Sequence, residues 1–168
     1  MKMKSLLRGT FLMVLTIFFS IHAHAQGTTN PDELRLQIQK MIQGNNFKNL
    51  ENYVNKDIKA NSLTQLKSSL TEFVGAEELE VYVAAKQDQE AVKKMQLDTA
   101  LPGFPPRPVL EQRAKSIRDA GWLFDVEPVG DMMIVGKKND PKSKGKSAIG
   151  SLYGVQNGRY VLVFARPK

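Results

Sequence analysis

The chain of 168 residues contains no cysteine, and its two histidines, His22 and His24, both lie near the amino terminus. Without cysteine the protein has no disulfide, no thiolate nucleophile and no cysteine-ligated zinc site. If residues 1–25 are removed, the histidines go with them, which excludes imidazole bases and histidine-bound metals from the rest. Carboxylates, lysines, arginines and tyrosines are then the groups left for chemistry, and we expect neither a metal nor a cofactor.

Residues 1–25 have the layout of a secretory signal peptide. A basic start, residues 1–8, precedes an apolar run from Gly9 to Ile21, and the small residues Ala23 and Ala25 stand at the expected cleavage site. A transmembrane helix needs about 20 apolar residues, so this run is short for a membrane anchor. We therefore expect cleavage before Gln26 and a soluble protein, in the periplasm or outside the cell, with no transmembrane segment.

Residues 26–168 are predicted to form a single domain. A chain of this length buries about two thirds of its unfolded surface without disulfides. The proline-rich segment 101–108 divides it by charge: residues 26–100 carry nine basic and eleven acidic groups, and residues 101–168 carry twelve and six. Two domains are the alternative, but the second piece alone would be only marginally stable.

Apolar residues at helical spacing predict helices in the first part of the chain. Asn30 is a typical N-cap, Pro31 suits the first helical position and Glu33 completes a capping box, which predicts a helix ending near Gly44. The same spacing predicts a short helix over residues 47–54 and longer ones over 63–74, 88–97 and 108–120.

Alternating apolar residues predict strands at 79–83 and then at 122–126, 132–136, 148–155 and 160–166. Gly130-Asp131 is interpreted as a turn, and Asn157-Gly158 predicts a tight type I′ turn between the last two strands. The final strand is apolar on both faces, so we expect it to be central or covered. The predicted fold class is α+β, with N-terminal helices packed on a C-terminal, antiparallel, curved β-meander.

Gly44-Asn45-Asn46-Phe47 through Leu50, the stretch Tyr53-Val54 to Asp57-Ile58, and a closing meander over Met132–Arg166 follow an N-terminal helix pair. This order resembles the nuclear transport factor 2-like superfamily. The resemblance implies a cone-like sheet wrapped around helices. It also implies a pocket, which in different members binds hydrophobic ligands, performs proton transfer or mediates dimerisation.

The catalytic features of that superfamily do not carry over. Isomerase-like members place an acidic base shortly after the first two helices, where this chain has Ala60-Asn61-Ser62 without a carboxylate. Dehydratase-like members need a histidine in the pocket, and residues 26–168 contain none. The resemblance therefore implies a binding or structural role.

Our leading interpretation is a non-catalytic domain that binds a small hydrophobic or anionic ligand, or a partner protein, through a pocket or a concave sheet. Aromatic side chains supply apolar lining and arginines at a rim recognise anions. A core position for the tryptophan and a surface role for the arginines are the plainer alternatives. The candidate ligand-binding residues are Trp122, Phe124, Tyr153 and Phe164, with Arg159 or Arg166 at the rim.

A lysine-rich segment, residues 137–146, is the strongest charged feature. Flexible lysines attract anionic surfaces without sequence discrimination, although a solvated hairpin loop is the plainer interpretation. No nucleic-acid partner is expected, because no basic helix and no interleaved aromatic residues accompany the lysines. The candidate partner-binding residues are Lys137, Lys138, Lys142, Lys144 and Lys146.

Two other functional classes stay open. One is a hydrolase or isomerase that uses a carboxylate base with a tyrosine or lysine acid. The other is an inhibitor or immunity protein that inserts the lysine-rich segment into an acidic cleft of an exported enzyme. Alternation places Glu78 and Glu80 opposite Leu79 and Val81, so we interpret those acids as a solvated strand face. The candidate carboxylates for the enzyme are Glu77, Glu80, Asp98, Asp125 and Glu127.

Overall fold

The computed structural model describes residues 27–99, 110–137 and 145–168. The predicted signal peptide, the proline-rich segment and the expected helix start at Pro108 lie outside these residues, as do Lys138, Lys142 and Lys144. The elements are α1 (Pro31–Gln43), η1 (Leu50–Tyr53), α2 (Ala60–Thr71), β1 (Glu77–Ala85), α3 (Gln89–Thr99), α4 (Leu110–Asp119), β2 (Trp122–Phe124), β3 (Pro128–Lys137), β4 (Lys146–Gln156), β5 (Arg159–Val163) and β6 (Ala165–Pro167).

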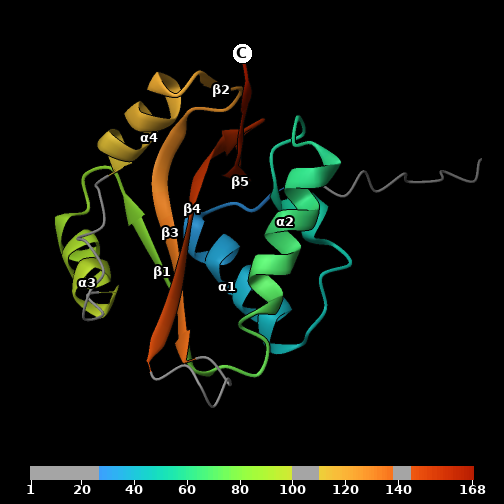
Figure 1. Ribbon diagram of the computed structural model, residues 1–168, viewed down its shortest axis with the longest axis vertical. Coiled ribbons are helices and arrows are strands. Elements are labelled where there is room, and N and C mark those ends of the chain that lie inside the picture. Colours follow the sequence, from blue (N-terminus) through green and yellow to red (C-terminus); the bar gives the residue numbers. More distant parts are fainter. Residues whose placement is uncertain (1–26, 100–109, 138–144) are drawn as a thin grey trace, which may run out of the picture.

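An antiparallel four-stranded sheet in the order β1-β3-β4-β5 forms the centre of the fold. The meander β3-β4-β5 provides three of its strands, and β1 joins beside β3. The helices α1 and α2 lie on one side of this sheet and α3 and α4 on the other (Figure 1). The predicted α+β class is confirmed, and the strands β2 and β6 form a separate two-stranded sheet.

Side chains alternate between the two faces of the sheet, as expected for strands. On the α1 side, Met132, Ile134 and Tyr153 pack in the main core with the apolar stripes of α1 and α2. On the other side, Met133 and Val135 pack against α3 in a smaller cluster. The sheet is therefore covered on both faces, which explains why β3 is apolar at consecutive positions.

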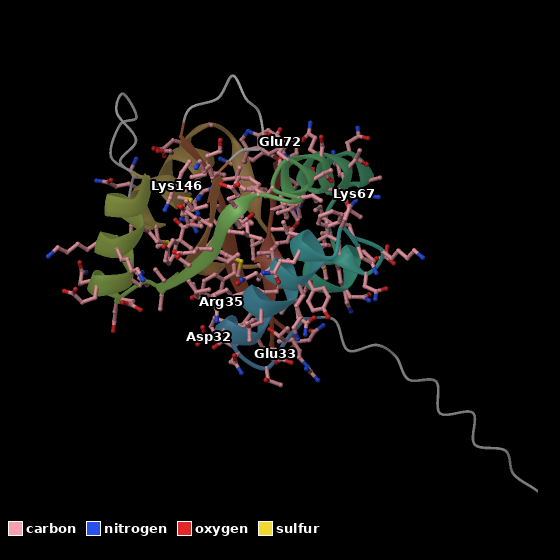
Figure 2. The ribbon with its side chains drawn as sticks, turned by 90° about the horizontal axis from the view of Figure 1, so that it is seen from below. Asp32, Glu33, Arg35, Lys67, Glu72 and Lys146 are labelled. Atoms are coloured by element: carbon pink, nitrogen blue, oxygen red, sulfur yellow. The ribbon has the colours of Figure 1, made fainter. Side chains whose placement is uncertain are left out.

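The start of α1 follows the predicted capping pattern with one change. The Asn30 side chain accepts a hydrogen bond from the Glu33 N–H at 2.8 Å. The Glu33 carboxylate reaches one residue beyond Asn30 and accepts from the N–H and hydroxyl of Thr29, at 2.9 and 2.8 Å. These bonds hold the pKa of Glu33 below its ordinary value. Figure 2 shows Glu33 beside Asp32 and Arg35 at this end of the helix.

Two helix predictions are wrong in detail. The expected helix over residues 47–54 is only the 3-10 turn η1, which ends where Val54 adopts an extended conformation and bridges to β5. The helix expected over 63–74 begins and ends three residues earlier, at Ala60 and Thr71. Ala60 and its neighbours carry no apolar periodicity, so the pattern gave no signal for this first turn.

Gly130-Asp131 is not a turn but part of β3. A Cβ on Gly130 would lie 2.1 Å from the ring of Tyr153, so this glycine makes room for a neighbouring aromatic side chain. Asp131 points to the other face, where its carboxylate accepts a hydrogen bond from Arg113 of α4 at 3.0 Å. Close packing and a partly buried ion pair therefore explain two residues whose types are typical of turns.

The C-terminal strands confirm one turn and correct two strand boundaries. Asn157 and Gly158 both have positive φ, 52° and 73°, as a type I′ turn requires. The strand expected over 122–126 is shorter and pairs with β6 instead of joining the meander. The strand expected over 160–166 is interrupted at Phe164, so that β5 and β6 belong to different sheets.

The strand β5 is last in the order of the central sheet, so it is not central, but short segments cover its outer edge. Thr28 exchanges two backbone hydrogen bonds with Tyr160, at 3.0 and 2.8 Å, and forms an antiparallel bridge. Further along, Val54 forms a parallel bridge to Leu162, and the next residue, Asn55, donates its N–H to the Leu162 carbonyl at 2.9 Å.

Candidate functional site

A pocket of about 240 Å³ lies where the segment before α2 meets β2 and β6. Three of the predicted ligand-binding residues, Trp122, Phe164 and Arg166, line it together. We call it the Trp122 pocket. Its apolar lining is Ile58, Trp122, Phe164, Ala165 and Pro167, and its polar lining is Asp57, Lys59, Asn61, Ser62, Gln65 and Arg166.

The short sheet of β2 and β6 positions Trp122. Gly121, with φ +87°, adopts a left-handed conformation after α4 and turns the chain into β2. Trp122 then lies opposite Pro167 in the antiparallel register, and the Lys168 N–H donates to the Gly121 carbonyl at 3.1 Å. The indole is 42% exposed, so the plainer interpretation of Trp122 as a core residue is wrong.

The buried side chain of Asn55 fixes Phe164 at the break between β5 and β6. Its amide oxygen accepts from the Phe164 N–H at 3.0 Å, and its amide nitrogen donates to the Phe164 carbonyl at 3.5 Å. The amide of Asn55 thus pairs with the backbone as a neighbouring strand would. Phe164 is held against the main core while it also lines the pocket.

An ion pair orients Arg166 at the rim. Its Nε donates to both carboxylate oxygens of Asp125, at 2.9 and 2.8 Å. This hydrogen bond raises the pKa of Arg166 above its ordinary value, so the guanidinium stays charged. The described residues provide no partner for its two terminal nitrogens. A ligand anion would therefore meet a cation whose position is already fixed.

The amino terminus of α2 adds positive potential to the same rim. Lys59 is the N-cap and makes no side-chain capping bond, and the first turn contains no acidic residue. The first backbone N–H groups of a helix have no intrahelical partner and carry the positive end of the helix dipole. Asn61 and Ser62, in this first turn, line the pocket with Lys59 and Arg166, and Asp57 provides the one carboxylate among the described lining residues.

The other predicted ligand-binding residues lie elsewhere. Tyr153 is only 1% exposed in the main core, its hydroxyl donates to the Ala84 carbonyl at 3.2 Å, and burial raises its pKa to about 12. Phe124 packs near Val126, Val161 and Val163, with the Arg118 guanidinium 5.3 Å from the centre of its ring. Arg159 lies next to the Asn157-Gly158 turn, away from this pocket.

The wall of the pocket formed by residues 57–59 and the first turns of α2 was not predicted from the sequence. Asp57, Ile58, Asn61 and Ser62 were considered only in connection with the family resemblance, and Lys59 belongs to no apolar pattern. One signal was present in the sequence, because a helix that begins after lysine lacks the usual capping side chain. Asn55 gave no comparable signal, since asparagine at a predicted helix end is ordinary.

No protein-family model, curated protein or solved structure matches this chain. The resemblance to the nuclear transport factor 2-like superfamily therefore stays a prediction. None of the helices in the described ranges has the length and apolar character needed to cross a bilayer. Nor do the described side chains include three or more histidines, aspartates or glutamates gathered as metal ligands.

The lysine-rich segment is described only at its two ends, where both lysines are close to glutamates. Lys137 Nζ lies 3.5 Å from a carboxylate oxygen of Glu77, and Lys146 Nζ lies 3.2 Å from one of Glu78. Glu80, like these two acids, is exposed. These acids are therefore solvated, as expected, but the bulge at Glu78 interrupts the strand alternation from which Glu78 and Glu80 were expected to share one face.

The four described carboxylates among those proposed for catalysis do not line a common pocket: Glu80 lines a groove beside β1, whereas Asp125 and Glu127 line neither that groove nor the Trp122 pocket. Asp125 is bound to Arg166, and Glu127 accepts two bonds from Arg118 at 2.5 and 2.7 Å. Both are engaged with arginines, and the side chain of Asp98 lies outside those described. The arrangement around the Trp122 pocket is suited to holding an amphipathic anion.

Proposed function

We propose that the protein binds a small amphipathic anion in the Trp122 pocket. The apolar part of the ligand contacts Trp122 and Phe164, and its anionic group faces Lys59, Arg166 and the amino terminus of α2. The observation that supports this proposal is the position of two aromatic side chains beside an oriented arginine and an uncapped helix start. Aromatic surfaces with a few convergent polar groups are typical of ligand sites.

The volume of the pocket restricts the size of the ligand. Sites for drug-sized molecules are commonly about 300–1,000 Å³, whereas this pocket has about 240 Å³. It fits one aromatic ring or a short branched chain with a carboxylate. Export, predicted from residues 1–25, would bring the protein to its ligand outside the cytoplasm.

Trp122 provides the assay, because it is the only tryptophan in the chain. We would titrate the protein with phenylacetate and follow the tryptophan fluorescence, with neutral phenylacetamide as the control ligand. We expect a saturable change with phenylacetate that weakens with added salt, because exposed charges are screened. A response that is absent, or equal for both compounds, would contradict the proposal.

A pair of lysine variants tests the anionic end of the site. Lys59 lines the pocket, whereas Lys48 is also exposed but is not among the lining residues. We expect Lys59→Gln to weaken phenylacetate binding a few-fold, since an exposed charge contributes about 1 kcal/mol or less. Lys48→Gln should leave binding unchanged. Equal effects of the two substitutions would indicate general attraction by net charge instead of a site.

A further inference from the structure

The two outer edges of the central sheet differ. Segments around Thr28 and Val54 cover the edge of β5, but no strand or bridge of the described residues pairs with the outer edge of β1. Figure 2 shows β1 between α1 and α3. A groove of about 340 Å³ beside β1 is lined by Arg35, Gln39, Leu79, Glu80, Val81, Tyr82 and Lys94.

The hydrogen-bond pattern shows which residues of β1 face the open edge. The Lys86 N–H donates to the Val129 carbonyl at 3.1 Å and continues the register of β1 with β3. Hydrogen-bonded and non-hydrogen-bonded positions alternate along an antiparallel pair. The backbone N–H and C=O groups of the even-numbered residues from Glu80 to Lys86 therefore point toward β3. The backbone groups of Val81, Val83 and Ala85 point outward.

The open part of the edge has defined limits. At one end a bulge lies between Glu77 and Glu80, where Glu78 has φ +52°. At the other end the Ala85 carbonyl accepts from the Asp88 N–H at 3.0 Å, so Ala85 offers only its N–H to a further strand. A regular stretch of seven residues, Glu80–Lys86, remains between these features. Bulges commonly end strand pairing, which limits a partner strand to this stretch.

We propose that β1 pairs edge to edge, in antiparallel orientation, with β1 of a second copy of this chain. Glu80-Val81-Tyr82-Val83-Ala84-Ala85-Lys86 begins with an acid and ends with a base, so it is complementary to itself when reversed. The register centred on Val83 places Glu80 of each copy opposite Lys86 of the other. It also places each Tyr82 opposite the small Ala84. Opposite charges across paired strands stabilise a sheet, and like charges destabilise it.

This register joins two four-stranded sheets into one. Outward-facing residues meet in hydrogen-bonded pairs, Val83 with Val83 and Val81 with Ala85, which allows about four interchain backbone hydrogen bonds. Both charged residues are available at the surface: Glu80 is exposed, and the ion-pair partner of Lys86 among the described residues is Glu111, at 3.8 Å. The contact is small, so we expect a dimer that dissociates on dilution.

A single cysteine tests the register, because the natural chain has none. In the Val83→Cys variant the two Cα atoms would be about 5.5 Å apart, within the range that a disulfide spans. We expect mild oxidation to link this variant into a dimer. The control is Ala85→Cys on the same strand, because its counterpart would be about 13 Å away, four residues along the strand. Equal linking of the two variants, or linking of neither, would overturn the proposal.

Charge exchange tests the partner. In Glu80→Lys both facing pairs become Lys–Lys, and in Lys86→Glu both become Glu–Glu, so each variant alone should be monomeric in analytical ultracentrifugation. A mixture of the two should form a heterodimer, because every facing pair is then opposite in charge. The protein is expressed from its full coding sequence for these experiments.

The wild-type chain should show concentration-dependent dimerisation under the same conditions. A wild-type protein that stays monomeric would overturn the proposal. An acidic peptide of another protein, attracted by Arg35 and Lys94, would then be the alternative occupant of the groove. Neither Glu80 nor Lys86 lines the Trp122 pocket, so these results are independent of ligand binding.

Discussion

Removal of the Tyr153 hydroxyl should destabilise the protein near neutral pH and stabilise it in strong alkali. The hydroxyl lies in the main core and donates to the Ala84 carbonyl at 3.2 Å. Burial, and then the nearby Tyr160, raise its pKa from 10.0 to about 12. The folded protein therefore holds this proton over a pH range in which the unfolded chain releases it.

The magnitude follows from these two effects. A net hydrogen bond contributes about 1 kcal/mol to stability, and the Ala84 carbonyl keeps its position in the β1–β3 ladder when the hydroxyl is removed. Because the pKa is raised by two units on folding, the wild-type protein loses about 3 kcal/mol of stability through this group in alkali. The loss begins near pH 10, the unfolded pKa, and is nearly complete by pH 12. In Tyr153→Phe this loss does not occur. The free energies of unfolding of the two proteins should therefore be equal at about pH 10.6.

The assay is urea unfolding followed by far-ultraviolet circular dichroism at a series of pH values between 8 and 12. Every other titratable group is present in both proteins, so the difference between wild type and Tyr153→Phe isolates one hydroxyl. A difference that stays constant over the whole range would refute the reasoning, because it would mean that Tyr153 titrates alike in the folded and unfolded chains.

Three further substitutions test other parts of the structure by urea unfolding. Asn55→Ala leaves the Phe164 N–H without its partner, so we expect a loss of about 1–3 kcal/mol together with weaker phenylacetate binding. Gly130→Ala places a Cβ against the Tyr153 ring and should cost about 1–3 kcal/mol or more. The lowered pKa of Glu33 gives stability that is present above its unfolded pKa and lost as the pH falls through the folded pKa. The difference between wild type and Glu33→Gln should therefore shrink on acidification.

The sequence predicted correctly those elements that are determined by interactions between neighbouring residues. Asn30 and Glu33 marked the start of α1 because capping involves neighbouring residues, and Asn157-Gly158 marked the type I′ turn because both positions need positive φ. Gly130 was misinterpreted because the reason for a glycine there is the ring of Tyr153, which belongs to the next strand. A tertiary contact of this kind leaves no pattern in the adjacent sequence.

The Trp122 pocket was predictable only in part for the same reason. Trp122, Phe164 and Arg166 stood out by residue type, because aromatic and arginine side chains are frequent in binding sites. These residues come together because the chain leaves the central sheet at Phe164 and continues as β6, which pairs with β2. That pairing joins residues far apart in the sequence. The buried amide of Asn55 stabilises that break through two backbone contacts 109 positions away in sequence.

The proposed ligand site and the proposed dimer both depend on how the two edges of the central sheet are covered. At β5, backbone groups that would otherwise be open are paired by Thr28 and by the segment at Val54. The Trp122 pocket forms just beyond this covered edge, where the segment after Val54 continues into α2 and the chain after β5 continues into β6. At β1 no described segment takes that role, and the bulge at Glu78 protects only one end. Unpaired strand edges tend to find partners unless they are protected, so a sheet that is covered at its β5 edge and open at its β1 edge is the asymmetry expected if a second copy completes it.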